Sequence, residues 1–405
     1  MTTGKNKQYD IVVVGGGIVG VSTAWQLKQH FPDAGIILVE KEKKLASHQT
    51  GHNSGVVHAG VYYQPGSLKA KFCKRGAADT KEFCKKHHLP LIQCGKLLVA
   101  TNQMECKRME ALERNCAING IKTAYINEKT LKKREPNIRG KAAIWVADTA
   151  ITDYLRITNK MADIFRSEGG MIRTGTKVFG LEEKHDHIVI RTNEGTFKAA
   201  YLLVCGGLMA DRLVRMMGIS ADFSIVPFRG EYYRLKPKHN GIVNHLIYPI
   251  PDPDLPFLGV HLTRMIDGSV TVGPNAVLGW KREGYGRFNA NGRDIFEMMT
   301  FPGFWKVIRK NFLSGLKEMN DSIFRSGYLE RVRKYCPSLS IDDLLAHPPG
   351  IRAQAVKSDG TLIHDFLFAE SQRSLHVCNA PSPAATAAIP IGSYLCEKFT
   401  ETFKL

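Results

Sequence analysis

Three glycines near the N-terminus have a spacing that suits nucleotide binding. Gly15, Gly17 and Gly20 follow the pattern G-x-G-x-x-G. In this pattern the first glycine permits a tight turn, the second lets a pyrophosphate approach the backbone, and the third lets a helix pack closely on a strand. Glu40 follows about twenty residues later, where an acid can accept hydrogen bonds from an unphosphorylated ribose. The spacing predicts an adenine dinucleotide site.

The elements that must position these residues are also visible in the sequence. Val12–Val14 are consecutive β-branched residues, typical of a strand that is buried on both faces. Residues 19–29 are expected to form a helix whose N-terminus attracts phosphate. A second apolar run, Ile36–Val39, ends at Glu40. This strand–turn–helix–strand context argues against the alternative, a glycine turn with no nucleotide.

A second segment points to the kind of dinucleotide. Residues 47–60 are rich in small and polar groups, for which a flavin enzyme has a use and a nicotinamide enzyme has none so soon after the ribose-binding acid. Ser54–Tyr63 reads SGVVHAGVYY and resembles the S-G-V-x-H-x-G-x-Y-Y segment of the L-2-hydroxyglutarate oxidase/dehydrogenase family. That family belongs to the D-amino-acid-oxidase superfamily of FAD enzymes. Ala380–Thr386, APSPAAT, resembles a further segment of the family, and the likeness runs from Tyr9 to Phe399.

The resemblance implies FAD, held without a covalent bond, although a tether through a histidine such as His48, His52 or His58 is the alternative. By resemblance Val178 contacts adenine through its backbone, and the helix that follows Ala385 faces the pyrimidine edge of the flavin. The Gly206–Gly207 pair is predicted to bind FAD, and the alternative is a plain strand end. The glycine motif and the resemblance together give the predicted FAD-binding residues, which are Gly15, Gly17, Ile18, Gly20, Glu40, Lys41, Thr50, Asn53, Ser54, Val178, Gly206, Gly207, Pro381, Ala384 and Ala385.

The implied reaction is the oxidation of L-2-hydroxyglutarate to 2-oxoglutarate, with hydride passing from C2 to flavin N5 and electrons passing on to a membrane quinone or oxygen. A base must take the hydroxyl proton, and a histidine that titrates near neutrality suits this task. We expect His58 or His261 to be this base, with the other orienting the substrate. The alternatives are a flavin-packing role for His58 and a structural role for His261.

The substrate carboxylates require cations. Arg352, in the segment Gly-Ile-Arg-Ala-Gln, is predicted to bind the α-carboxylate because a guanidinium holds a carboxylate through two hydrogen bonds. The alternative for Arg352 is an ion pair within the protein. Arg229 and Arg264 are candidates for the distal carboxylate, and Tyr248 and Tyr63 are candidate hydroxyl donors. Other substrates, namely an amino acid, a secondary amine or glycerol 3-phosphate, stay open.

The predicted fold is α/β, or α+β overall, with a Rossmann-like FAD-binding domain on a parallel sheet and a discontinuous substrate domain on a mainly antiparallel sheet. Alternating segments separated by turn residues predict the second sheet. Those segments are 229–235, 246–250, 259–264 and 269–273. The FAD-binding domain is predicted to comprise residues 1–88, 146–220 and 346–405, and the substrate domain 89–145 and 221–345.

Composition narrows the partners. The 405 residues are 43% hydrophobic and carry a formal charge of +18, which favours anionic partners such as a dicarboxylate. No nucleic-acid-binding motif accompanies the charge, and the nine cysteines match no zinc spacing, so we expect neither nucleic acid nor metal. Residues 301–312 mix aromatic and basic side chains, which suits either an anionic membrane surface or a core-facing helix. We expect a bacterial cytoplasmic protein, with peripheral attachment to the inner membrane if residues 301–312 bind lipid.

Overall fold

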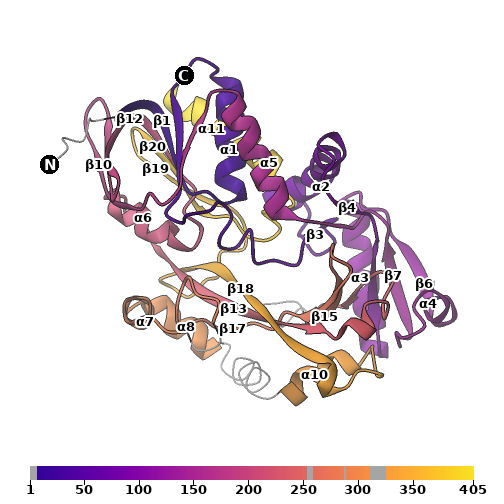
Figure 1. Cartoon of the computed structure of the whole chain (residues 1–405). Coiled ribbons are helices and arrows are strands. Elements are labelled where there is room, and N and C mark those ends of the chain that lie inside the picture. Colours follow the sequence, from indigo (N-terminus) through magenta and orange to yellow (C-terminus); the bar gives the residue numbers. More distant parts are fainter. Residues whose placement is uncertain (1–6, 253–258, 287–288, 311–324) are drawn as a thin grey trace.

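The computed structural model describes residues 7–252, 259–286, 289–310 and 325–405. Two large sheets form the upper and lower parts of the molecule in Figure 1. Between them lies a small antiparallel sheet of β3 (Val56–Val57), β8 (Ala150–Thr152) and β4 (Leu91–Ile92). The predicted mixed α/β fold, with one parallel and one mainly antiparallel sheet, is confirmed.

The upper sheet is parallel at its centre. β1 (Lys7–Val14) lies between β12 (Gly195–Val204) and β2 (Ile36–Val39) and runs parallel to both. β20 (Ser374–Asn379) adds to β12, and β9 (Met171–Arg173) adds to β2, again in parallel. The remaining strands pair antiparallel, and they are β10 (Val178–Glu183), β11 (Ile188–Thr192) and β19 (Leu367–Glu370). The glycine turn therefore follows the central strand of a Rossmann-like sheet, as predicted.

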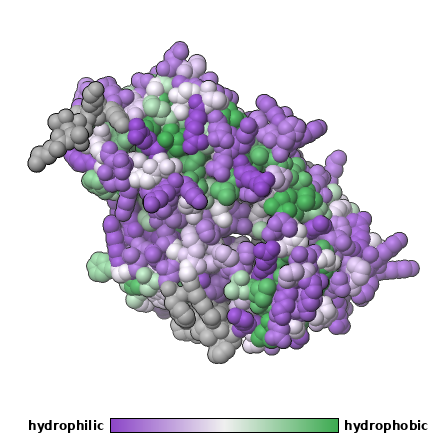
Figure 2. Space-filling view, viewed as in Figure 1, coloured by the Kyte–Doolittle hydropathy of each residue, from purple (hydrophilic) through white to green (hydrophobic). Residues whose placement is uncertain are grey.

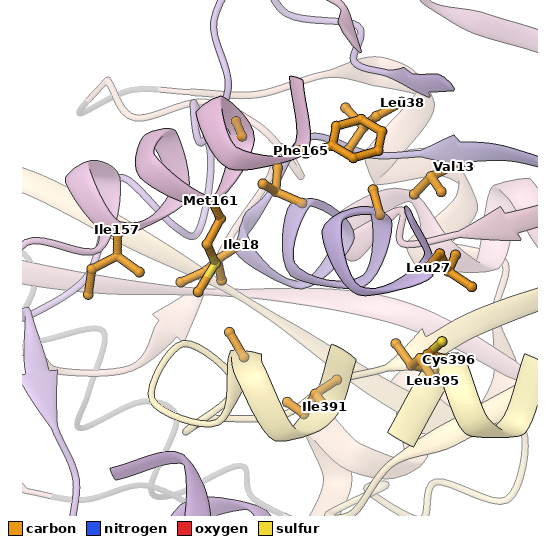
Figure 3. Close-up of a cluster of buried hydrophobic side chains, with 14 of the residues drawn as sticks. Val13, Ile18, Leu27, Leu38, Ile157, Met161, Phe165, Ile391, Leu395 and Cys396 are labelled. Atoms are coloured by element: carbon orange, nitrogen blue, oxygen red, sulfur yellow. The ribbon is translucent and has the colours of Figure 1, made fainter. Parts of the chain in front are cut away.

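Helices cover one face of this sheet. α1 (Ile18–His30) packs against both α5 (Tyr154–Ser167) and α11 (Ala388–Phe403). Figure 3 shows side chains from the three helices and the sheet meeting in one apolar cluster, which includes fully buried Leu27 and Leu38. Burying a side chain of this kind contributes about 1.5–3 kcal/mol. Two segments distant in the sequence, α1 and α11, are thereby held together beside the glycine turn.

In the lower sheet β18 and β17 both pair with β13, and the order from β13 is β13-β16-β15-β14-β5-β7-β6. All its pairings are antiparallel except that of β14 with β5. Its strands are β5 (Lys96–Ala100), β6 (Ala124–Asn127), β7 (Ala142–Val146), β13 (Phe223–Leu235), β14 (Leu246–Pro249), β15 (His261–Arg264), β16 (Val270–Gly273), β17 (Val277–Leu278) and β18 (Leu344–Lys357). The predicted boundary at residue 346 falls inside β18, which pairs along almost all of β13. The domain limits themselves stay a prediction.

Further helices flank the two sheets. They are α2 (Leu68–Lys86), α3 (Gln103–Ile118), α4 (Glu128–Arg134), α6 (Ala210–Met216), α7 (Gly292–Met299), α8 (Pro302–Lys310) and α10 (Arg325–Arg333). Asn127 and Asp153 cap α4 and α5, because their side chains accept hydrogen bonds from the first turns of these helices. Part of the predicted aromatic and basic segment, residues 311–312, lies outside the described residues. Among the helices that the structure does describe, none combines the length and the apolar character needed to cross a membrane.

Candidate active site

The glycine turn is sterically fixed. Gly15 has φ +115°, and a Cβ there would collide with the carbonyl oxygen of Cys205 on the neighbouring strand. A Cβ at Gly20 would collide with the carbonyl oxygen of Gly15. α1 begins at Ile18, directly after Gly17, and no side chain caps it from the position of Gly17. The turn thus leaves a helix N-terminus at which, within the described residues, only the Ile18 N–H is taken, by Thr50 Oγ1, and such a terminus attracts phosphate.

A cavity of about 800 Å³ opens beside this turn. Its volume lies within the range of about 300–1,000 Å³ that is usual for ligand and cofactor sites. Of the predicted FAD-binding residues, those that line it are Gly15, Gly17, Glu40, Lys41, Thr50, Val178, Gly206 and Gly207. Ile18 and Gly20 lie behind the wall, where the Ile18 N–H donates to Thr50 Oγ1 at 3.0 Å. Segments from three separate parts of the chain therefore face one space.

Glu40 is held rigidly at the end of β2. Its Oε2 accepts from the Gly16 N–H at 2.6 Å, and its Oε1 accepts from the Glu42 N–H at 2.8 Å. Each carboxylate oxygen retains capacity to accept another hydrogen bond, as from a ribose hydroxyl. The helix N-terminus after Gly17, a fixed acid and an adjoining cavity fit the phosphates and ribose of FAD.

The rim of this cavity includes a segment that the sequence analysis missed. Glu283 forms an ion pair with Lys41, and the ring of Tyr285 stacks on His52 with centroids 3.6 Å apart. A carboxylate oxygen of Glu42, a ring nitrogen of His48 and a carboxylate oxygen of Glu283 lie within 4.8 Å of one another. His48 Nε2 is 3.0 Å from Glu42 Oε1. These contacts fasten a loop of the upper part to a segment of the lower part. No sequence motif predicts these contacts, because they join side chains that are distant in the chain.

A buried ion pair secures the same segment. Arg282, 2% exposed, donates through Nη2 to Asp211 Oδ2 at 2.9 Å, and its Nη1 contacts the other carboxylate oxygen. Asp211 lies on α6 and is fully buried. Arg282 lowers the pKa of the Asp211 carboxyl against the opposing effect of burial. A paired guanidinium and carboxylate of this kind anchor residues 280–285 over the cavity.

The predicted C-terminal segment lies beside His58. The His58 N–H donates to Thr386 Oγ1 at 3.2 Å, and Thr386 Oγ1 lies 2.9 Å from Tyr154 Oη. The turn that contains Pro381, Ala384 and Ala385 is thus tied to the loop that carries the histidine. These three residues do not line the larger cavity.

Two other predicted cofactor residues lie apart from the larger cavity. Asn53 and Ser54 line a smaller cavity of about 180 Å³, together with Tyr232 and His347 of the lower sheet. The Asn53 side chain also closes its own loop, because its Oδ1 accepts from the Gly55 N–H at 2.8 Å. The loop of residues 51–54 therefore faces the lower sheet directly.

One face of the lower sheet gathers the polar groups of the candidate substrate site. Successive residues of a strand point to opposite faces, so the pairing registers determine which side chains share a face. Ile247 lies opposite Leu262, which places Tyr248 and His261 together, and their rings stack with centroids 3.8 Å apart. By the same alternation this face includes Lys96, Tyr248, His261, Tyr232 and Arg352. The opposite face carries an apolar cluster that includes Leu97, Ile247 and Leu262.

The pKa values of both candidate histidines lie below the near-neutral range expected for the base, which leaves both imidazoles uncharged at pH 7. Burial is the main cause that lowers the pKa of His58 well below its usual value, and the charges of Lys96, His261 and Arg352 lower it further. Burial likewise lowers the pKa of His261 to about 3, with Lys96 and Arg352 adding to the effect. His261 Nδ1 lies 3.0 Å from the Gly259 carbonyl oxygen, which can only accept a hydrogen bond. Nδ1 therefore carries the proton, and Nε2 is left to accept one.

Sequence reasoning missed Lys96. Its side chain is 1% exposed, and its Nζ lies 4.4 Å from the ring centroid of Tyr248 and 5.3 Å from that of Tyr62. Burial lowers its pKa to about 8. The sequence signal for this residue was a lysine at the start of an otherwise apolar strand. A lysine in that position more often lies at the surface, at the end of a strand. Only the pairing of β5 with β14 shows that it is enclosed.

The other candidates are distributed unevenly. Tyr63 lies under the Lys69 ammonium, 5.1 Å from ring centroid to Nζ, and burial raises its pKa well above the usual value. Arg229 lies opposite Ile351, the residue next to Arg352, so the side chains of Arg229 and Arg352 project to opposite faces of the sheet. There it pairs with Glu231 at 3.4 Å and donates to the Gly286 carbonyl. The structure does not bring Arg229 to the histidines, and Arg264 likewise alternates away from His261.

Comparison with known proteins agrees with this architecture. The family model described as FAD dependent oxidoreductase matches residues 10–398. The L-2-hydroxyglutarate dehydrogenase of Escherichia coli strain K12 is 56% identical over 391 residues, which cover 96% of this chain and 93% of that protein. The mitochondrial L-2-hydroxyglutarate dehydrogenase of Bos taurus is 41% identical over 98% of this chain and 90% of that protein.

Solved structures resemble the fold at lower identity. An L-α-glycerophosphate oxidase from Mycoplasma pneumoniae with FAD bound has a TM-score of 0.79 at 22% identity, over 98% of this chain and 95% of that one. Glycine oxidase from Geobacillus kaustophilus has a TM-score of 0.72 at 16% identity, over 97% and 95%. The chain belongs to the FAD-dependent oxidoreductase family and, within it, to the group that contains the L-2-hydroxyglutarate dehydrogenases.

Proposed function

We propose that this enzyme oxidises L-2-hydroxyglutarate to 2-oxoglutarate. The observation that carries the proposal is the cluster of His58 and buried His261, on whose ring Tyr248 stacks. The cations Lys96 and Arg352 share the face of the lower sheet that carries His261. Neutral imidazoles can accept a hydroxyl proton, and cations in a buried site suit an acidic substrate. The relatives that share more than half of its residues are named for this activity.

In this mechanism each protein group has one task. Arg352 holds the α-carboxylate through its guanidinium. His261 Nε2 takes the hydroxyl proton, and His58 orients the hydroxyl-bearing carbon; the reverse assignment is the alternative. Loss of this proton and of the C2 hydrogen with its electron pair leaves the C2 carbonyl of 2-oxoglutarate. FAD, when bound, supplies the two-electron redox chemistry. Tyr248 supports His261 by stacking on its ring.

Residues of the glycine turn and the larger cavity would hold the cofactor. The helix N-terminus after Gly17 suits the pyrophosphate, and Glu40 suits the ribose. We propose that FAD is bound without a covalent link. Acid precipitation should leave the flavin in the supernatant, whereas flavin in the protein pellet would establish a tether.

Anaerobic mixing tests the proposed substrate. L-2-hydroxyglutarate should bleach the oxidised flavin spectrum of the purified holoenzyme, with one 2-oxoglutarate formed per flavin. An unchanged spectrum would contradict the assignment. The same experiment with D-2-hydroxyglutarate, an amino acid, a secondary amine and glycerol 3-phosphate separates the alternatives, because only the true substrate bleaches the flavin rapidly.

For the electron acceptor we propose a membrane quinone, with oxygen as the slower alternative. The supporting observation is an apolar and basic surface on α7 and α8, at the lower left of Figures 1 and 2. Phe296 is 69% exposed and Trp305 is 50% exposed, and Lys306, Arg309 and Lys310 lie on the same helix as Trp305. Aromatic and basic side chains of this kind bind anionic lipid surfaces.

Sedimentation with vesicles tests this surface, which would place the enzyme on the cytoplasmic face of the membrane. The protein should pellet with phosphatidylglycerol vesicles and not with phosphatidylcholine vesicles. The double variant Phe296→Glu, Trp305→Glu should stay in the supernatant and should keep its flavin bleaching. Equal pelleting of the variant and the unmodified protein would refute lipid contact through α7 and α8.

A further inference from the structure

Lys96 is a buried cation without a counter-charge. Within the described residues no carboxylate lies within ion-pair distance of its Nζ. The groups that surround the ammonium are the aromatic faces of Tyr62 and Tyr248 and, at longer range, cysteine thiols. Burial of an ammonium is costly unless an anion or strong acceptors compensate it. The site is therefore electrostatically incomplete without an anion.

A second group beside Lys96 lacks a partner. The Tyr62 hydroxyl is buried and makes no hydrogen bond within the described part of the chain. Burial raises its pKa well above the usual value, so it keeps its proton and can donate it in a hydrogen bond. A buried donor with no acceptor is rare in folded proteins, and it marks a position where a bound group supplies the acceptor. An ammonium and a hydroxyl that both lack an acceptor are complementary to a carboxylate.

We propose that Lys96, with Tyr62, binds the distal carboxylate of the substrate and so makes the enzyme select dicarboxylates over monocarboxylates. This inference rests on the proposed function. It assigns the distal carboxylate to Lys96, because the candidates from the sequence, Arg229 and Arg264, do not lie on the face of the sheet that carries His261. It leaves the α-carboxylate to Arg352 and the chemistry at C2 to the histidines.

The order of strands supports this division of tasks. Lys96 on β5 and Arg352 on β18 lie on opposite sides of His261 on β15, across the row β5-β14-β15-β16-β13-β18. The charges of both cations act on His58 and on His261, which indicates that both cations lie near the two histidines. The strands β5 and β18 are five spacings of about 4.8 Å apart, so both long side chains must reach towards the histidines for a five-carbon dicarboxylate to bridge them. A monocarboxylate satisfies only one end.

Substrate discrimination tests the proposal. Flavin reduction is measured anaerobically with L-2-hydroxyglutarate and with L-2-hydroxyvalerate, which has the same carbon chain and lacks the distal carboxylate. In the unmodified enzyme kcat/KM should favour the dicarboxylate about 100-fold. Lys96→Met should lower kcat/KM for L-2-hydroxyglutarate about 100-fold, mainly through KM, and should leave that for L-2-hydroxyvalerate within about threefold. The control Lys141→Met, an equal loss of charge at an exposed lysine beside β7, should change neither.

The outcomes separate this inference from the proposed function. If L-2-hydroxyglutarate does not bleach the unmodified holoenzyme, the proposed function fails. If it does bleach the flavin, and Lys96→Met lowers kcat/KM equally for both substrates or for neither, the role of Lys96 is refuted while the proposed function stands. Tyr62→Phe provides a second test that does not depend on the folding of Lys96→Met. It should lower kcat/KM for the dicarboxylate about tenfold, and an equal fall with L-2-hydroxyvalerate would overturn the proposal.

Discussion

The nucleotide cavity and the substrate face are built in opposite ways. The nucleotide cavity depends on backbone geometry at the turn from Gly15 to Gly20 and on one acid, Glu40, at a strand end. The substrate face depends on single side chains drawn from β5, β14, β15, β13 and β18. A site made of backbone needs residues that are close in sequence, whereas a site made of side chains needs only a common face of a sheet.

The two regions also differ in how charge is balanced. At the nucleotide rim Lys41 is paired with Glu283, and buried Arg282 is paired with Asp211. On the substrate face Lys96 has no carboxylate partner within the described residues. Paired charges hold the two parts of the molecule together, because each ion satisfies the other. An unpaired buried cation is costly unless a bound anion compensates it. The contrast therefore supports the proposal that Lys96 binds substrate, whereas the charges at the nucleotide rim are already paired.

The largest expected effect comes from the backbone of the nucleotide cavity. Gly15→Ala places a Cβ against the Cys205 carbonyl at a residue with φ +115°, so the turn must distort and FAD should be lost almost completely. Flavin content after purification measures this. Gly241→Ala is the matched control, because Gly241 has no atom within 4 Å of the added Cβ. A variant at Gly15 that purifies with stoichiometric FAD would show that the turn does not set cofactor binding.

The next effect separates the two histidines of the substrate face. His261→Gln should slow anaerobic flavin reduction about 100-fold or more, because glutamine cannot take the hydroxyl proton that Nε2 accepts. Cofactor content should not change, since His261 lies on the lower sheet and not in the nucleotide cavity. His58→Gln should raise KM more than it lowers the reduction rate. If His58→Gln instead causes the larger fall in rate, the two roles are exchanged.

The smallest effect is a pH dependence that only the dicarboxylate should show. Lys96 has a lowered pKa of about 8, so the free enzyme loses this positive charge above pH 8. kcat/KM for L-2-hydroxyglutarate should fall about tenfold per pH unit from pH 8 to 10, and that for L-2-hydroxyvalerate should stay level. The other titratable groups facing Lys96 with raised pKa values are Cys73, Cys94, Cys116, Tyr62 and Tyr248.

Those groups keep their protons after Lys96 has lost its own, because burial raises the pKa of each. On the acid side His58 and His261 also face Lys96, and both have lowered pKa values. With the pKa of His261 at about 3, kcat/KM should show no histidine limb between pH 5 and 8. A limb near pH 6.5 would mean that the base titrates as an exposed histidine does. A parallel fall for both substrates above pH 8 would exclude Lys96 as its cause.

Local sequence patterns predicted the first strand–turn–helix–strand unit of the upper sheet. The run of β-branched residues, the glycine spacing and the acid at Glu40 predicted a strand, a turn, a helix and a second strand, and these are β1, the turn, α1 and β2. The prediction succeeds because a dinucleotide turn is local, so its steric requirements are written in residues that are neighbours in the chain. The resemblance at Ser54–Tyr63 and Ala380–Thr386 added FAD and the family, both of which the comparisons confirm.

The choice of charges at the candidate substrate site depends on the tertiary structure. Arg352 was predicted to bind the α-carboxylate and Arg229 was a candidate for the distal one, yet the register of β13 with β18 places them on opposite faces of the sheet. Lys96 looked like a surface lysine, yet the pairing of β5 with β14 encloses it beside Tyr248. A change of register by one residue reverses every side chain of a strand. Because register between distant strands is a property of the whole fold, no local pattern in the sequence could assign these side chains.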